Sequence, residues 1–207
     1  MINLFLDIET IPSGDKVLEL PHPATMSKAD TIEKWKKEKM PAEIEKEFRK
    51  RAVISHQCKV ISIGYGANNW EVVCYSEKNE KKPIFRLNKF IKSIDDPAQN
   101  INWIGWNIRK FDLPILRMRA GKYGCDELKW AIPFKRYDNR IIDLMDIFTP
   151  SDMTSMKTAC DFFDIKHKEE LDGSMVYDAY LQEKHDLIKE YNLKEIIVLK
   201  QLHKILI

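Results

Sequence analysis

The chain has 207 residues, of which 44% are hydrophobic, and a formal net charge of +2 at pH 7. This length allows one sizeable core with little room for a second, so we expect a single domain over residues 1–207. The four cysteines lack zinc-site spacing, no apolar run approaches bilayer length, and the first residues do not resemble a signal peptide. These features argue against a disulfide scaffold, a zinc finger and a membrane protein, and we expect a soluble, cytoplasmic protein.

The first half of the chain combines strand and helix patterns. Residues 2–8 predict a buried strand that ends in a loop, and the apolar runs 59–65 and 70–75 predict a hairpin. Between them, a Lys- and Glu-rich segment at about 27–52 predicts two short amphipathic helices interrupted by Pro41. We interpret this segment as an insertion at the edge of the sheet. It is either a flap that grips a substrate or a solvated cover, and its composition alone favours the cover.

The second half is mainly helical. The spacing of apolar residues predicts a strand at 101–106 and helices over 83–94, 110–121, 154–163 and 186–206, whereas 140–148 is ambiguous. Early strands followed by helices indicate a layered α/β domain. Between Gly105 and Arg140 there are nine Lys or Arg residues against four Asp or Glu. This excess would suit a phosphate-bearing ligand, but charge alone favours a solvated face.

Three places in the chain carry candidate catalytic side chains. Asp7 and Glu9 are two residues apart on the first strand, so both side chains leave the same face, roughly 7 Å apart. Two neighbouring carboxylates are costly to bury unless a cation lies between them, so a divalent metal and plain solvent exposure are about equally favoured by this pair.

The second place is the segment from Gly105 to Leu116, in which a strand is followed by Asn107 and then by Asp112 near a helix start. Helix capping alone could explain Asp112, and Asn107 could be an ordinary turn residue. The third place is Tyr191 and Glu195, which are four residues apart on one helical face. For an isolated pair, a surface position would be the usual explanation.

Taken in order, Asp7-Ile8-Glu9-Thr10, the Gly-Trp-Asn block ending Phe-Asp-Leu-Pro-Ile-Leu, and the late Tyr-(three residues)-acid resemble the three exonuclease motifs of the DEDD, or DnaQ-like, superfamily. The tyrosine variant, DEDDy, fits best. Within it, the chain most resembles predicted 3′-5′ exonucleases related to the proofreading domains of family B DNA polymerases. This resemblance implies a ribonuclease H-like three-layer fold, with a mixed central sheet flanked by helices.

The resemblance also implies a catalytic apparatus with two divalent metal ions, Mg²⁺ or Mn²⁺, held by Asp7, Glu9, Asp112 and Glu195. Tyr191 would orient the attacking water or help to deprotonate it. The residues implied to bind the substrate are Thr10, Trp106, Asn107 and Phe111. Asp143 occupies the position of an accessory acid.

Two departures from the family pattern affect the third motif. Glu195 stands where the family has Asp, and Asn192 follows the tyrosine where Cys is common. The longer Glu shifts the carboxylate, which leaves slow turnover, a preference for Mn²⁺ and loss of activity all open. His185 and Glu190 offer a rival placement that mimics the histidine variant of the superfamily, but five residues rotate a helix by about 140°, so only one scheme can face the site. We prefer Tyr191 with Glu195 because the apolar run that follows supplies a packing face.

The expected function is removal of nucleoside 5′-monophosphates from single-stranded 3′ ends, with DNA favoured over RNA and no membrane partner. The chain contains no polymerase domain, so a polymerase or other replication and repair proteins would be partners in trans. The alternative is a catalytically weak or inactive domain that binds nucleic-acid ends or a partner protein. A purely structural role ranks last because it would require three motifs in the right order by chance.

Overall fold

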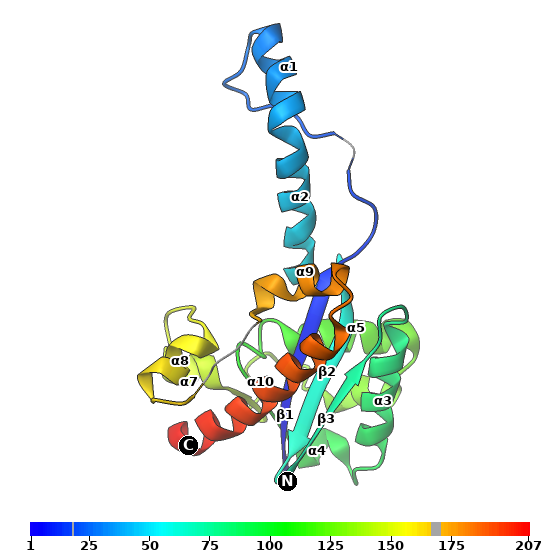
Figure 1. The fold of residues 1–207 in the computed structure, drawn as a ribbon. Coiled ribbons are helices and arrows are strands. Elements are labelled where there is room, and N and C mark those ends of the chain that lie inside the picture. The colour runs from blue at the N-terminus through cyan, green and yellow to red at the C-terminus, as the bar shows by residue number, and fades with distance from the viewer. Residues whose placement is uncertain (18, 167–170) are drawn as a thin grey trace. The chain divides into compact units, whose positions relative to one another are not determined.

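The computed structural model describes residues 1–17, 19–166 and 171–207, and it is built around a five-stranded mixed sheet (Figure 1). The strands, in the order β3-β2-β1-β4-β5, are β3 (Trp70–Tyr75), β2 (Cys58–Ala67), β1 (Ile2–Pro12), β4 (Ile101–Gly105) and β5 (Ile141–Asp143). Strand β4 pairs in parallel with β1 and β5, whereas β3 pairs antiparallel with β2. The predicted α/β class and mixed sheet are confirmed.

The predicted hairpin is formed by β2 and β3. Ala67 pairs with Trp70, which leaves a two-residue connection of Asn68 and Asn69. Asn68 has a φ of 49°, in the left-handed region that asparagine tolerates better than most residues. Asn68 therefore suits the conformation of this turn.

Ten α-helices are found in the described part of the chain. They are α1 (Ala29–Glu38), α2 (Met40–Lys50), α3 (Lys81–Lys92), α4 (Pro97–Asn100), α5 (Asp112–Tyr123), α6 (Asp126–Ala131), α7 (Leu144–Phe148), α8 (Met156–Phe162), α9 (Val176–Leu181) and α10 (His185–Leu206); the 3₁₀ turns are η1 (Arg51–Val53) and η2 (Gly173–Met175). The predicted helices are all present, with shifted ends, and the ambiguous segment 140–148 is a short strand followed by a short helix. None of the helices in the described ranges is long and apolar enough to cross a membrane.

Residues 11–59 form one compact unit, and residues 1–10 with 60–207 form another. We call them the α1–α2 unit and the sheet unit. In the α1–α2 unit the two predicted helices are present, and Pro41 lies in the first turn of α2. The buried helical side chains of this unit are Trp35 and Phe48. The predicted insertion at 27–52 lies within this unit, while the single-domain expectation stays a prediction.

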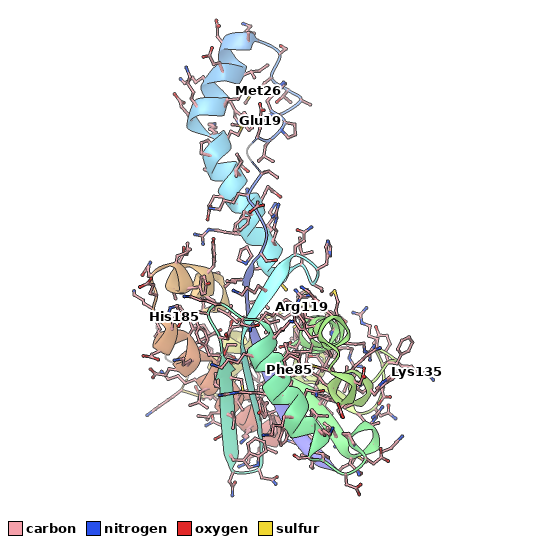
Figure 2. All side chains as sticks on the ribbon, turned by 90° about the vertical axis from the view of Figure 1, so that its right-hand side faces the viewer. Glu19, Met26, Phe85, Arg119, Lys135 and His185 are labelled. Atoms are coloured by element: carbon pink, nitrogen blue, oxygen red, sulfur yellow. The ribbon has the colours of Figure 1, made fainter. Side chains whose placement is uncertain are left out.

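The sheet unit has helices on both faces of its sheet. Phe5 of β1 belongs to a buried cluster that also contains side chains of α7, α8 and α10. Because side chains alternate along a strand, Leu4, Leu6 and Ile8 point to the opposite face. Figure 2 shows His185 of α10 and Arg119 of α5 on opposite sides of the unit. Odd-numbered residues of β1 therefore face α10.

A buried ion pair ties α5 to the second strand. Arg119 donates to the Glu80 carboxylate (2.7 Å), which also accepts from the backbone N–H of Val60 (2.8 Å) and from the Tyr123 hydroxyl. Both charged side chains are more than 90% buried. Since a buried carboxylate needs several donors, this arrangement satisfies Glu80 and fixes the helix against the sheet.

Candidate active site

The first two carboxylates of the site lie on β1. Asp7 and Glu9 follow Phe5 at intervals of two residues, so they share the face of the sheet that α10 covers. Glu9 is buried with 7% of its surface exposed, and Asp7 is half-buried. This face of β1 therefore carries the two acids next to Phe5, which belongs to the hydrophobic cluster.

Helix α10 brings a second set of polar side chains to this face. Glu195 lies three residues after Asn192 and four after Tyr191, so its side chain is a neighbour of both on the helix surface. Asn192 is fully buried, and Glu195 is 5% exposed. Burial of two polar groups in a helix otherwise packed through apolar residues indicates a site rather than a surface.

Asn192 links α10 to strands β1 and β2. Its Nδ2 donates to Asp7 Oδ2 (2.6 Å), and its Oδ1 accepts from the hydroxyl of Ser62 (2.7 Å), which is itself fully buried on β2. Gly64 allows this close approach, because a Cβ there would lie 3.0 Å from Asn192 Nδ2 and 2.9 Å from Ile196 Cγ1. The Asp7 carboxylate is thus held in one orientation by a hydrogen-bonded chain.

The fourth acid, Asp112, is the first residue of α5 and is 2% exposed. Its Oδ1 accepts a hydrogen bond from the backbone N–H of Ile8 (3.0 Å), which joins the start of α5 to β1 between Asp7 and Glu9. Burial raises the pKa of Asp112 to about 8, and the charges of Asp143 and Glu195 add to this effect. A carboxyl with so high a pKa is held in a site that disfavours negative charge.

The pKa values of Asp7 and Tyr191 are both raised by burial and by the neighbouring carboxylates. Burial raises the pKa of Asp7 well above its ordinary value, and Glu9, Asp112 and Glu195 raise it further, while the Asn192 hydrogen bond opposes the change. Burial also raises the pKa of the Tyr191 phenol, as do Glu9, Glu195 and Asp7. Tyr191 is hydrogen-bonded to Glu195, so its phenol stays protonated and donates.

The donor set suits a hard divalent cation. Four carboxylates from β1, α5 and α10 repel one another, and a bound cation would relieve this repulsion. Oxygen-only ligands of this kind favour ions such as Mg²⁺ over zinc. Within residues 1–17, 19–166 and 171–207, no three His, Cys, Asp or Glu side chains are already arranged as a metal-binding group. The fit is therefore one of ligand chemistry and charge.

Asp143, the expected accessory acid, anchors the loop that precedes α5. It is 1% exposed and accepts from the backbone N–H groups of Asn107 (2.8 Å), Arg109 (3.1 Å) and Met145 (3.2 Å). Asn107 has a φ of 55°, a left-handed conformation that this anchoring supports. Its Oδ1 is buried and accepts no hydrogen bond from the described residues.

The remaining expected substrate-binding residues have different surroundings. Trp106 packs against the hydrophobic cluster, and its indole N–H donates to the Thr154 carbonyl (2.9 Å). Phe111 is half-buried immediately before α5, and Thr10 is half-buried on β1 next to Glu9. Their roles stay predictions.

The rival pair of the third motif points elsewhere. His185 bonds to the Tyr75 hydroxyl (2.6 Å) through Nδ1, with Glu77 3.7 Å away from its Nε2. Glu190 is exposed and pairs with Lys194 (2.8 Å). Glu195, by contrast, is buried near Asp7, Asp112 and Tyr191, and its assignment to the third motif stays a prediction.

Asn192 and Ser62 were not predicted as site residues. A signal for Asn192 was present: it lies at helical spacing between the apolar Ile188 and Ile196, where a polar residue must find a buried partner. Ser62 gave no such signal, because a serine inside an apolar strand is common and its partner is 130 residues away.

A mixed sheet with helices on both faces, and carboxylates gathered at one place on it, define the class as an α/β exonuclease fold of the ribonuclease H-like type. A family model described as "Predicted 3′-5′ exonuclease related to the exonuclease domain of PolB" matches residues 51–199. The chain belongs to this family. The matched range includes Asp112, Tyr191 and Glu195, whereas Asp7 and Glu9 precede it. Comparison with curated proteins gives no match.

Proposed function

We propose that this protein is an active, metal-dependent 3′-5′ exonuclease that hydrolyses single-stranded nucleic acid, DNA in preference to RNA, and releases nucleoside 5′-monophosphates. The observation that carries the proposal is the convergence of Asp7, Glu9, Asp112 and Glu195 from three elements onto one place beside β1. Such a cluster is unfavourable for folding by itself, so a chemical role explains it best.

Asp7, Glu9, Asp112 and Glu195 would hold two divalent ions, Mg²⁺ or Mn²⁺. When bound, such ions supply activation of a water nucleophile and stabilisation of the departing 3′ oxygen. Asn192 fixes the orientation of Asp7, and the Ile8 N–H fixes that of Asp112. These contacts place the two carboxylates before any ligand enters.

Tyr191 has the role of a hydrogen-bond donor. Because its pKa is raised by burial and by Glu9, Glu195 and Asp7, it is a poor base at neutral pH. The proposal therefore assigns it the orientation of the attacking water, together with Glu195.

The 3′ end of the strand would enter beside the loop before α5. The buried, unpaired Oδ1 of Asn107 is an acceptor for a sugar hydroxyl or a base amino group, and the Phe111 ring next to Asp112 can stack on the terminal base. Thr10 and Trp106 complete the proposed contacts. A polymerase or repair complex acting in trans and a cytoplasmic location remain part of this proposal.

The test uses 20-mer DNA and RNA carrying a label at either end, with Mg²⁺, Mn²⁺ or EDTA. We expect stepwise shortening from the 3′ end that needs metal and is lost in Asp7→Asn, which keeps the side-chain shape. Asp152→Asn removes an exposed carboxylate from the same unit and should cut at the wild-type rate. Intact substrates with wild-type protein in every metal condition would refute the proposal.

A second candidate function is binding of nucleic-acid ends without efficient hydrolysis. It is favoured by two observations: Glu195 is longer than the usual Asp, and Asn192 occupies one oxygen of Asp7. If wild-type protein binds the 20-mer but leaves it intact, and Glu195→Asp restores shortening, this second function is the correct one.

A further inference from the structure

A cavity of about 250 Å³ lies on the sheet unit beside the loop that leads into α5. Its apolar floor is formed by side chains of α5, β5 and the connection between α6 and β5, namely Leu113, Ile132, Pro133 and Ile141. Its rim is basic and includes Arg109, Lys110, Arg117 and Arg136. The volume is slightly below the roughly 300–1,000 Å³ of small-molecule sites, so the cavity has room for part of a ligand, such as one base.

The positive charge of this rim is only partly neutralised by nearby acids. Asp146 pairs with Arg109 (3.3 Å) and Asp138 pairs with Arg140 (3.0 Å). Among the described residues, no carboxylate forms an ion pair with Lys110, Arg117 or Arg136. These uncompensated cations attract an anionic ligand.

Arg117 stabilises the shape of the cavity as well as its charge. Its guanidinium donates to the carbonyl oxygens of Ile132 (2.9 Å), Pro133 and Phe134 (3.3 Å), which fixes the loop after α6 against α5. Arg117 is thus a preorganised part of the rim. Lys110 and Arg136, by contrast, are exposed.

Exposed aromatic rings stand next to these cations. Phe134 is 89% exposed and Tyr137 is 77% exposed. Their ring centroids lie 5.3 Å from the guanidinium carbons of Arg117 and Arg109, respectively. Exposed aromatic rings beside cations provide surfaces on which nucleic-acid bases can stack, and such stacking tolerates any base sequence. Lys135, at the outer edge of the unit in Figure 2, extends the same basic loop.

We propose that this cavity binds the phosphate backbone and a base of single-stranded nucleic acid, at a site separate from the carboxylate cluster. The inference rests on the proposed function, because it supplies the second point at which the substrate strand is held. Lys110 of the cavity rim and Asp112 of the carboxylate cluster are two residues apart, so one nucleic-acid strand can contact both sites.

The test measures binding of fluorescein-labelled dT20 by anisotropy, in EDTA so that no cleavage occurs, over a series of salt concentrations. The variant is Lys110→Glu/Arg136→Glu, which leaves Arg117 and the loop intact. The control, Lys89→Glu/Lys122→Glu, changes the net charge equally at exposed positions outside the cavity. We expect binding to be weakened by roughly 10-fold or more in the variant only. The slope of log K against log salt concentration should be smaller by about 1.4 for its two lost cations, since each single-strand phosphate contact contributes about 0.7.

Phe134→Ala should weaken binding by roughly 5-fold or more with an unchanged salt slope, because it removes stacking and no charge. Competition with dTMP separates a site for a strand from a site for free nucleotide: dTMP at concentrations equal to the dT20 phosphate should displace little. Displacement of dT20 by such dTMP would overturn the proposal of a strand site.

The outcomes also separate this inference from the proposed exonuclease activity. Loss of dT20 binding in the cavity variant, with no cleavage by wild-type protein, would support the cavity and refute the exonuclease. Equal binding by the cavity variant and its control, or no binding by wild-type protein, would overturn the cavity whatever the cleavage assay shows.

Discussion

The buried carboxylate Asp112 should make the metal-free protein less stable as the pH rises from 6 to 8. In the folded chain its pKa is about 8, against an ordinary value of 3.8. Between these values the folded chain keeps a proton that the unfolded chain has lost, so the free energy of unfolding falls with increasing pH. For one such group the loss over pH 6 to 8 is about 2 kcal/mol. The raised pKa of Asp7 acts in the same direction.

The assay is thermal unfolding in EDTA at pH 6, 7 and 8, with Asp112→Asn as the comparison. For a chain of this length about 2 kcal/mol corresponds to a fall in Tm of roughly 4–8 °C. Asn keeps an oxygen for the Ile8 N–H but cannot ionise, so the variant should show a smaller fall and a higher Tm than wild type at pH 8. Burial lowers the pKa of His203, which gives a contribution of opposite sign, but the comparison cancels it. Equal pH dependence in the two proteins would refute the reasoning.

Three further predictions concern the site and its support. Millimolar Mn²⁺ should raise the Tm at pH 8 more than at pH 6, because metal binding requires ionised carboxylates, and Asp7→Asn should abolish most of this gain; an equal gain at both pH values would contradict it. Tyr191→Phe should lower the rate of 3′ shortening by roughly 100-fold while leaving the Tm shift with Mn²⁺ intact, so a lost metal shift would show that Tyr191 organises the cluster instead. Asn192→Leu should lower the free energy of unfolding by roughly 2–4 kcal/mol in urea, because it leaves Ser62 and Asp7 without a partner, and the double variant Ser62→Ala/Asn192→Leu should recover part of the loss; strictly additive losses would exclude the coupling.

The order of elements could be predicted from the sequence because local patterns carry it. Alternation on β1, the Asn68-Asn69 turn and the apolar spacing of α10 act over a few residues. The boundary near residue 141 could not be predicted, because a strand of three residues followed directly by a helix of five leaves too short a period to recognise.

Of the site, the sequence by itself determined which carboxylates were candidates, since their spacing on a strand and on a helix fixes the face from which each pair projects. Only the tertiary structure showed that Glu195, and not Glu190, lies beside the other carboxylates, because this depends on which side of α10 packs against β1 and β2. The same holds for the contact of Ser62, Asn192 and Asp7, and for the basic cavity beside α5. In each case the partners are far apart in the chain, and no local pattern records a contact that folding alone creates.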